Sequence, residues 1–132
     1  MRHPRIGKQA SVTVETTDDD TAAAVGNADV DAIATTALIL YIEAVASDLI
    51  DDCCEEGEIS VGSAVNVRHL AAAPVGARIR VTAKVTAVKG RRVDFAVEAH
   101  HARKTLITGT HQRVVVNRDR FLKQQGMALS PT

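Results

Sequence analysis

Aromatic residues are nearly absent from this chain of 132 residues, which has no tryptophan, one tyrosine and two phenylalanines. Nucleic-acid-binding proteins commonly stack bases on aromatic side chains and carry an excess of basic residues. Here 16 basic residues balance 16 acidic ones, so the formal net charge is zero. The composition therefore argues against a nucleic-acid partner, and it leaves little electrostatic repulsion between copies of the chain.

Cysteines and long apolar runs are also scarce. The only cysteines, Cys53 and Cys54, are adjacent, and neighbouring residues close a disulfide only through a strained ring. Two reduced thiols favour a cytoplasmic protein. The polar segment 11–20 follows the basic N-terminal residues where a signal peptide needs an apolar stretch, and the run 32–46 is too short to span a bilayer. We expect no membrane partner.

What the chain has instead is a large share of small aliphatic residues, since 45% of it is hydrophobic. A chain of this length buries enough surface to sustain one core without disulfides or metals, so we expect a single domain over residues 1–132. Its last part, 118–132, is expected to be a polar C-terminal tail. We found no metal-ligand spacing and expect no metal site and no cofactor.

The hydrophobic pattern predicts one long helix between strands. Apolar residues recur at spacings of three and four after Asp29, the expected N-cap, and Gly57 is the expected end. Before this helix, 10–15 alternates as a strand does, and after it the period changes to two. In the first of the later strands, one face is expected to carry Ile59, Val61, Val65, Val67 and His69. Further strands are expected within 79–87, 93–99 and 105–116.

Short connections between the later strands indicate antiparallel neighbours. The order of elements therefore predicts an α+β fold in which a five-stranded antiparallel sheet wraps around one long helix. A helix covered on one side only leaves apolar surface exposed, so we expect the chain to form a homodimer or a dimer of dimers.

Two residues stand out as candidates for chemistry. Glu43 lies at the centre of the helix among apolar neighbours, where a carboxylate is costly to bury unless it has a partner or a function. It either acts as a base, acid or nucleophile, or it has no chemical role and lies on a narrow solvated stripe of the helix or pairs with an arginine from the sheet. His69 ends an apolar strand face just before 71–74, where its imidazole would point toward the helix; alone, such a histidine is more often a core residue. A hydroxyl at Thr35 or Thr36 can serve the first helical turn.

Basic residues gather at one expected hairpin turn. Lys89, Arg91 and Arg92 are most simply solvated charges, but they can also meet the phosphates of a bulky substrate. The glycine at Gly62 has no side chain and would allow part of a substrate to approach the backbone closely.

Several short segments lie at characteristic distances from one another along the chain: Ala34-Thr35 followed by Glu43, Val61-Gly62, Val67-Arg68-His69, Val88 to Arg92, and Gly109 to Arg113. Together they resemble the fluoroacetyl-CoA thioesterase family, whose members have the hot-dog fold. The resemblance runs from about Val25 to Phe121. One departure is that 16–31, which corresponds to an aromatic-rich lid in the namesake enzyme, contains no aromatic residue.

The resemblance implies that this protein hydrolyses an acyl-CoA thioester to free acid and CoA, with CoA present only as part of the substrate. It also implies that Thr35, Glu43 and His69 are catalytic: Glu43 as nucleophile or general base, Thr35 as a positioning hydroxyl, and His69 as acid/base for the leaving thiolate. The acyl group, and whether CoA or a carrier protein delivers it, stay open. The alternative is a binding module for acyl thioesters or small ligands that does not catalyse hydrolysis.

Overall fold

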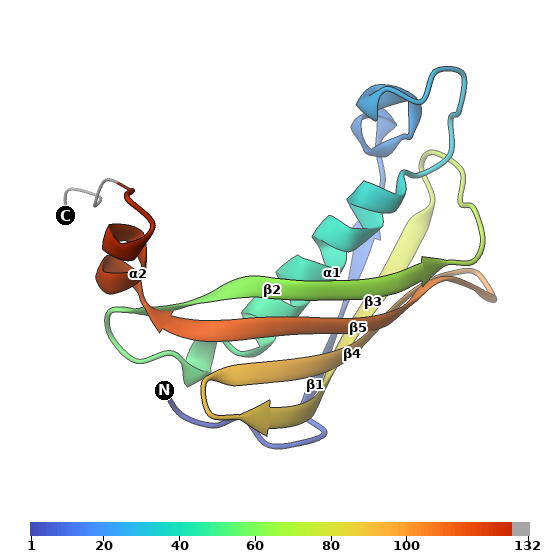
Figure 1. Ribbon diagram of the computed structural model, residues 1–132. Coiled ribbons are helices and arrows are strands. Elements are labelled where there is room, and N and C mark those ends of the chain that lie inside the picture. Colours follow the sequence, from blue (N-terminus) through green and yellow to red (C-terminus); the bar gives the residue numbers. More distant parts are fainter. Residues whose placement is uncertain (128–132) are drawn as a thin grey trace.

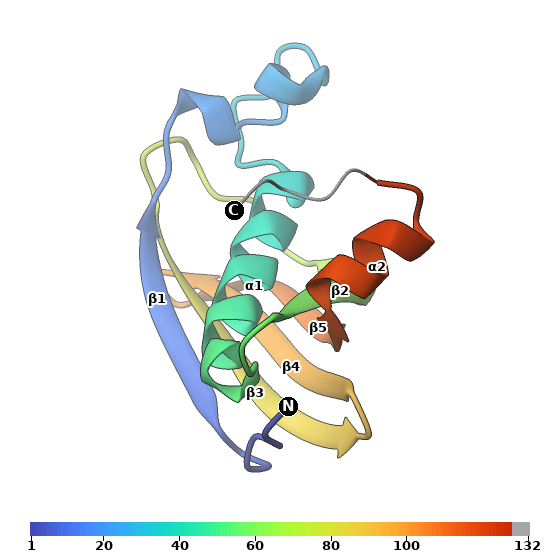
Figure 2. The ribbon, with the colours of Figure 1, turned by 90° about the vertical axis from the view of Figure 1, so that its left-hand side faces the viewer.

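Five strands form one antiparallel sheet that curves around a single long helix in the computed structural model, which describes residues 1–127 (Figures 1 and 2). The sheet order is β1-β3-β4-β5-β2, so β1 and β2 are the edge strands. The predicted hot-dog architecture is confirmed. The elements are β1 (Gln9–Glu15), α1 (Thr35–Leu49), β2 (Glu58–His69), β3 (Arg78–Lys89), β4 (Arg92–His101), β5 (Lys104–Asn117) and α2 (Arg118–Gln124).

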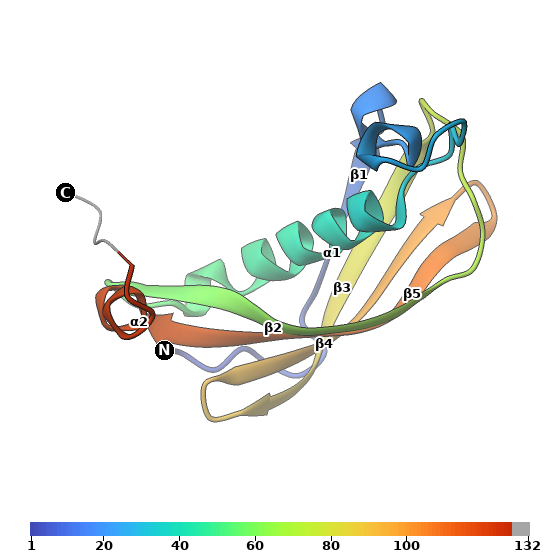
Figure 3. The same cartoon turned by 45° about the horizontal axis from the view of Figure 1, so that its top comes forward.

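The core lies between α1 and the concave face of the sheet (Figure 3). One side of α1 carries the buried residues Leu38, Ile42, Val45, Ala46 and Leu49. Alternate residues of β3 and β4 face this side, among them Val81 and Phe95, and both are fully buried. Removing this apolar surface from water is the main stabilising contribution to the two-layer arrangement.

The helix is shorter at both ends than the sequence pattern predicted. Asp29 is not its N-cap: this residue has a φ of 66° and lies in an irregular segment before the helix. The Ile33 amide donates to the Ala73 carbonyl, and the Ala34 amide donates to the Asp20 carbonyl, so neighbouring loops hold this stretch extended. As a result α1 begins at Thr35, and it ends at Leu49 rather than at Gly57 because 51–53 form a separate 3-10 turn.

A β-bulge in β2 overturns the prediction that one face carries all its apolar residues. The register between β2 and β5 shifts between Gly62 and Ala64, where Ser63 is the extra residue. An inserted residue reverses which side chains face the core. Ile59 and Val61 therefore lie on the face opposite to Val65, Val67 and His69. The helix-facing positions before the bulge belong to Ser60 and Gly62, which pair with Val115 and Arg113 on β5.

Close packing of β5 against β2 requires glycine at position 109. A Cβ at Gly109 would overlap the Asn66 carbonyl oxygen and lie 2.7 Å from the Val67 Cα, both in the backbone of β2. Gly109→Ala is therefore expected to lower the free energy of unfolding by about 3 kcal/mol, because neither strand can yield without breaking the ladder. Urea denaturation measures this loss, with the exposed neighbour Thr110→Ala as control. Equal stability of the two variants would contradict the expectation.

The segment after β5, expected to be a polar tail, begins with a short helix that has no buried residues. Asn117 caps α2 by accepting a hydrogen bond from the Arg120 amide. The last five residues of the predicted tail, 128–132, lie outside the described residues. Within residues 1–127, no helix is long and apolar enough to cross a membrane.

Candidate active site

The structure brings Thr35 and His69 into direct contact. Thr35 is the first residue of α1, and His69 is the last residue of β2, which ends beside this helix end (Figure 1). The Thr35 Oγ1 and the His69 Nδ1 are 2.7 Å apart, and both residues are exposed. Within residues 1–127, no side chain caps the N-terminus of α1. Its first-turn N–H groups and the positive end of the helix dipole therefore lie next to this pair.

Glu43 forms an ion pair with an arginine from the sheet, which was one of the alternatives left open by the sequence. Its Oε2 lies 3.5 Å from the Arg113 Nη1; the arginine side chain is 8% exposed and that of Glu43 is 41% exposed. Gly62 makes this approach possible, because a Cβ at that position would lie 2.9 Å from the Glu43 Oε2. Glu43 thus combines an anchored carboxylate with access from solvent.

Polar atoms of β2 and β5 hold Arg113 in place. Its Nε donates to the Ser60 Oγ at 2.9 Å, and its Nη2 donates to the Ser60 carbonyl at 3.0 Å. Its Nη1 lies 3.3 Å from the Nε2 of His111, a buried histidine stacked on Phe95. Burial lowers the pKa of the Arg113 guanidinium, and the nearby Glu43 carboxylate opposes this effect.

Thr35–His69 and Glu43–Arg113 are separate groups within one chain. Thr35 and Glu43 are eight residues apart on α1. At the helical rise, this separation is about 12 Å along the axis. Among the described residues, Glu43 has Arg113 as its ion-pair partner, whereas His69 has Thr35 as its hydrogen-bond partner. One chain therefore presents two halves of the predicted constellation.

Next to Glu43 lies a hollow of about 380 Å³ between α1 and the segment before it. Three of its lining residues are acidic, namely Glu43 and two aspartates of a 3-10 turn at 18–20, and the others are small or aliphatic. The lining residues are Asp19, Asp20, Val25, Ala34, Thr36, Ala37, Ile39, Leu40 and Glu43. The hollow has no aromatic wall, in keeping with the absence of aromatics from 16–31.

Two of the basic residues at the predicted hairpin turn are bound to acids of the same chain. Arg91 Nη1 lies 2.6 Å from Glu58, and Arg92 Nε lies 3.2 Å from Asp94. Glu58 also accepts a hydrogen bond from the Met1 ammonium, and these donors lower its pKa from 4.5 to about 2. Lys89 is exposed. A role for these three residues in substrate binding stays a prediction.

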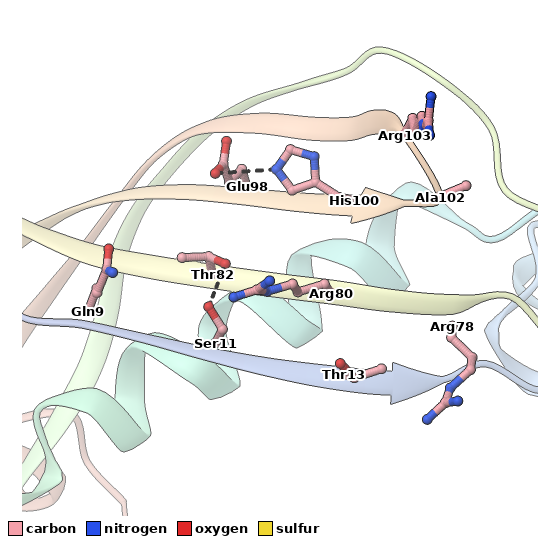
Figure 4. Close-up of a pocket in the computed structure, with 10 residues that line it drawn as sticks. All are labelled: Gln9, Ser11, Thr13, Arg78, Arg80, Thr82, Glu98, His100, Ala102 and Arg103. Atoms are coloured by element: carbon pink, nitrogen blue, oxygen red, sulfur yellow. Dashed lines mark hydrogen bonds and ion pairs between the residues drawn. The ribbon is translucent and has the colours of Figure 1, made fainter.

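A second hollow, of about 600 Å³, lies on the face of the sheet turned away from α1 (Figure 4). Its walls are polar side chains of β1, β3 and β4, including Arg78, Arg80 and His100. His100 is 3.3 Å from Glu98, and Ser11 shares a hydrogen bond with Thr82. These residues alternate with core residues along their strands, as the solvated face of an antiparallel sheet does. Within residues 1–127, no group of three or more histidine, cysteine or acidic side chains is placed to hold a metal ion.

Comparison with known protein families identifies the chain's relatives. Residues 16–119 match the family described as fluoroacetyl-CoA-specific thioesterase. The chain belongs to this family. The fluoroacetyl-CoA thioesterase of Streptantibioticus cattleyicolor is 42% identical over 67 residues, which are 51% of this chain and 48% of that protein. The aligned segment thus spans about half the length of this relative.

Solved structures give matches over nearly the whole chain. The fluoroacetyl-CoA thioesterase FlK superposes with a TM-score of 0.89 at 26% identity, covering 97% of this chain and 99% of FlK. A thioesterase superfamily member from Thermus thermophilus gives 0.84 at 29% identity, covering 96% and 98%. A variant of FlK in complex with fluoroacetate and CoA gives a TM-score of 0.84 at 28% identity, covering 89% of this chain and 99% of the variant. Another variant, in complex with acetyl-CoA, gives 0.88 at 26% identity, covering 93% and 97%.

Sequence reasoning did not assign roles to Arg113 and His111. Both lie on the helix-facing side of β5, and they share this side with the buried Ile107 and Val115. Two polar residues at inward-facing positions of an otherwise apolar strand are the signal that identifies them, since buried polar groups require partners.

Proposed function

We propose that this thioesterase-family protein hydrolyses acyl-CoA thioesters to a free acid and CoA, using Glu43, Thr35 and His69. The observation that carries the proposal is the 2.7 Å contact between Thr35 and His69 at an uncapped helix N-terminus, in a chain that also holds a solvent-accessible carboxylate against a buried arginine. Family membership supports the reaction class, and the FlK complexes with CoA compounds support the substrate class.

The first half of the site suits the carbonyl and the leaving group. The N–H groups at the start of α1 are donors for the oxygen that becomes negative when the thioester carbonyl is attacked. The Thr35 hydroxyl and the His69 imidazole fix one another, so that His69 is placed to give a proton to the departing CoA thiolate. Hydrolysis then breaks the C–S bond and adds the elements of water across it.

The second half supplies the attack. Glu43 either takes a proton from water that adds to the carbonyl, or it adds to the carbonyl itself and forms an anhydride that water hydrolyses. Arg113 fixes the orientation of the carboxylate in both cases. Apart from its three carboxylates, the hollow beside Glu43 has small or aliphatic walls, so we propose that it receives a short acyl group.

We infer that two copies of the chain complete each site. The outer edge of β2 has no partner strand among the described residues, and long unpaired edges favour pairing with another chain. Apolar side chains are exposed beside this edge, including Val65 on β2 at 38% and Leu40 on α1 at 64%. Pairing here would bring Glu43 of one copy toward Thr35 and His69 of its partner. We place the dimer in the cytoplasm, where the free thiols Cys53 and Cys54 stay reduced.

Substitution at Gly62 tests the position of the carboxylate. In Gly62→Ala the new methyl group displaces the Glu43 carboxylate, since that flexible end yields more easily than the strand. We expect kcat to fall about tenfold to a hundredfold with little change in Tm. Ser63→Ala, at the exposed bulge residue, is the matched control. If Gly62→Ala keeps the kcat of this control, the carboxylate does not act from this position.

A panel of acyl-CoA thioesters assayed by thiol release tests the proposed reaction itself. Wild-type protein is expected to release CoA from at least one short-chain substrate far faster than Glu43→Ala does. Thermal stabilisation by acyl-CoA without thiol release would support the binding module instead. Equal and negligible turnover by both proteins across the panel would refute the proposed hydrolysis.

A further inference from the structure

His111 is the one histidine among the described residues that is fully buried, at 1% exposure, and both of its ring nitrogens have partners. Its Nδ1 is 2.8 Å from the Ala64 carbonyl oxygen. Its Nε2 is 3.3 Å from the Arg113 Nη1. The same Nη1 faces Glu43 at 3.5 Å, so a continuous chain of contacts runs from the core of the sheet to the carboxylate.

These partners determine the tautomer of His111. A carbonyl oxygen only accepts hydrogen bonds, so Nδ1 carries the proton and donates to Ala64. A guanidinium only donates, so Nε2 is unprotonated and accepts from Arg113. Both contacts therefore require the neutral ring with its proton on Nδ1.

The surroundings hold the ring in this orientation. The bulge between Gly62 and Ala64 places the Ala64 carbonyl within reach of the Nδ1, and Phe95 stacks on the ring at 6.0 Å between centroids. Burial lowers the pKa of His111, and the charge of Arg113 lowers it further; the Ala64 hydrogen bond and Glu43 oppose this shift. The neutral form of His111 therefore persists at pH values below its ordinary pKa of 6.5, and it is lost as the pH falls through the lowered pKa.

We propose that His111 is a positioning residue of the thioesterase site: as a neutral acceptor it fixes Arg113, which in turn fixes Glu43. The inference rests on the proposed function of Glu43 and adds a second proton-dependent group to it. Protonation of His111 turns Nε2 into a donor facing another donor, so Arg113 must move and the carboxylate loses its orientation. Glu43 from α1 and Arg113 from β5 are the charged groups that face the ring.

The tautomer can be tested on the resting protein, without substrate. In a long-range ¹H–¹⁵N correlation spectrum of wild-type protein, the His111 Nδ1 is expected to have the shift of a protonated nitrogen and the Nε2 that of an unprotonated one. The guanidinium signals of Arg113 are expected to stay sharp at neutral pH and to broaden as His111 titrates. The proposal would be overturned if the ring is protonated on Nε2, or if the Arg113 signals do not change as His111 titrates.

Two variants separate positioning from packing. His111→Gln keeps one donor and one acceptor at the end of its side chain, whereas His111→Phe keeps only the stack on Phe95. We expect His111→Phe to lower kcat about tenfold to a hundredfold with KM nearly unchanged, and His111→Gln to recover most of that loss. In His111→Gln the acid limb of the kcat profile is expected to move to lower pH, because one of its protonation steps is removed.

The outcomes distinguish this proposal from the proposed function. If His111 had only a structural role, both variants would lower the folded fraction and Tm, His111→Gln would not recover kcat, and the acid limb of the kcat profile would stay in place. That pattern would overturn the positioning role. A different result is that the spectra show the expected tautomer coupled to Arg113, but neither the wild-type protein nor any variant hydrolyses a thioester. In that case the link from His111 to Arg113 is supported and the proposed hydrolysis is refuted.

Discussion

Glu43→Gln is expected to lower kcat for acyl-CoA hydrolysis about a thousandfold while the protein stays folded. The amide has nearly the same shape as the carboxylate, but it neither accepts a proton from water nor adds to a thioester. Glu43 is partly exposed, and its only ion-pair partner among the described residues, Arg113, keeps its hydrogen bonds to Ser60. Steady-state assays of thiol release together with thermal unfolding separate the two effects.

Asp48→Asn is the matched control for Glu43→Gln. Asp48 is an exposed carboxylate on the same helix, so its variant makes the same change of charge away from Arg113. We expect it to keep wild-type kcat. A Glu43→Gln protein that stays within about twofold of this control would remove Glu43 from the mechanism, since general bases and nucleophiles contribute far more than that.

The two roles of Glu43 differ in whether the enzyme becomes acylated. As a nucleophile, the carboxylate forms a mixed anhydride when CoA leaves, so acid quenching during a single turnover traps the acyl group on the peptide that contains Glu43. As a general base, it leaves that peptide unmodified at every time. Mass spectrometry of the quenched digest therefore decides between the roles on the wild-type protein.

The fold was predictable because its strongest signals are periodic. Alternation in β3 and β4 and the three-and-four spacing through α1 survive in the structure, with Val81, Phe95 and Ile42 all in the core. The ends of α1 were not predictable, because the backbone bonds of Ile33 and Ala34 to distant loops set where it begins. Local sequence pattern contains no information about such tertiary contacts.

The candidate site was predictable as a set of residue types but not as a geometry. Glu43 stood out as a carboxylate among apolar residues. The structure supplies Arg113, the sheet arginine that the ion-pair alternative required. The bulge at 62–64 was missed because a strict period of two was assumed along β2. That one inserted residue places Gly62 beneath the Glu43 carboxylate and directs the Ala64 carbonyl toward His111.

Mixing two inactive variants is expected to restore activity if the site is shared between copies. In a dimer of Glu43→Gln with His69→Ala, one site takes Glu43 from the second chain and His69 from the first, so it is intact; the other site carries both lesions. Random exchange of subunits gives about half mixed dimers, so recovery approaches about a quarter of wild-type activity. Each variant is expected to be inactive alone, so the recovered signal has no background.

Subunit exchange must be shown independently, and differently tagged chains with native mass spectrometry do so. Thr35→Ala mixed with Glu43→Gln should complement as well, because Thr35 contacts His69 and belongs to the same half of the site. Thr35→Ala mixed with His69→Ala should not, because every site then lacks one member of that half. If mixed dimers form and Glu43→Gln with His69→Ala stays inactive, then all three residues act within one chain. The separation of about 12 Å along α1 would then have to be closed by movement of the helix or of the substrate between them.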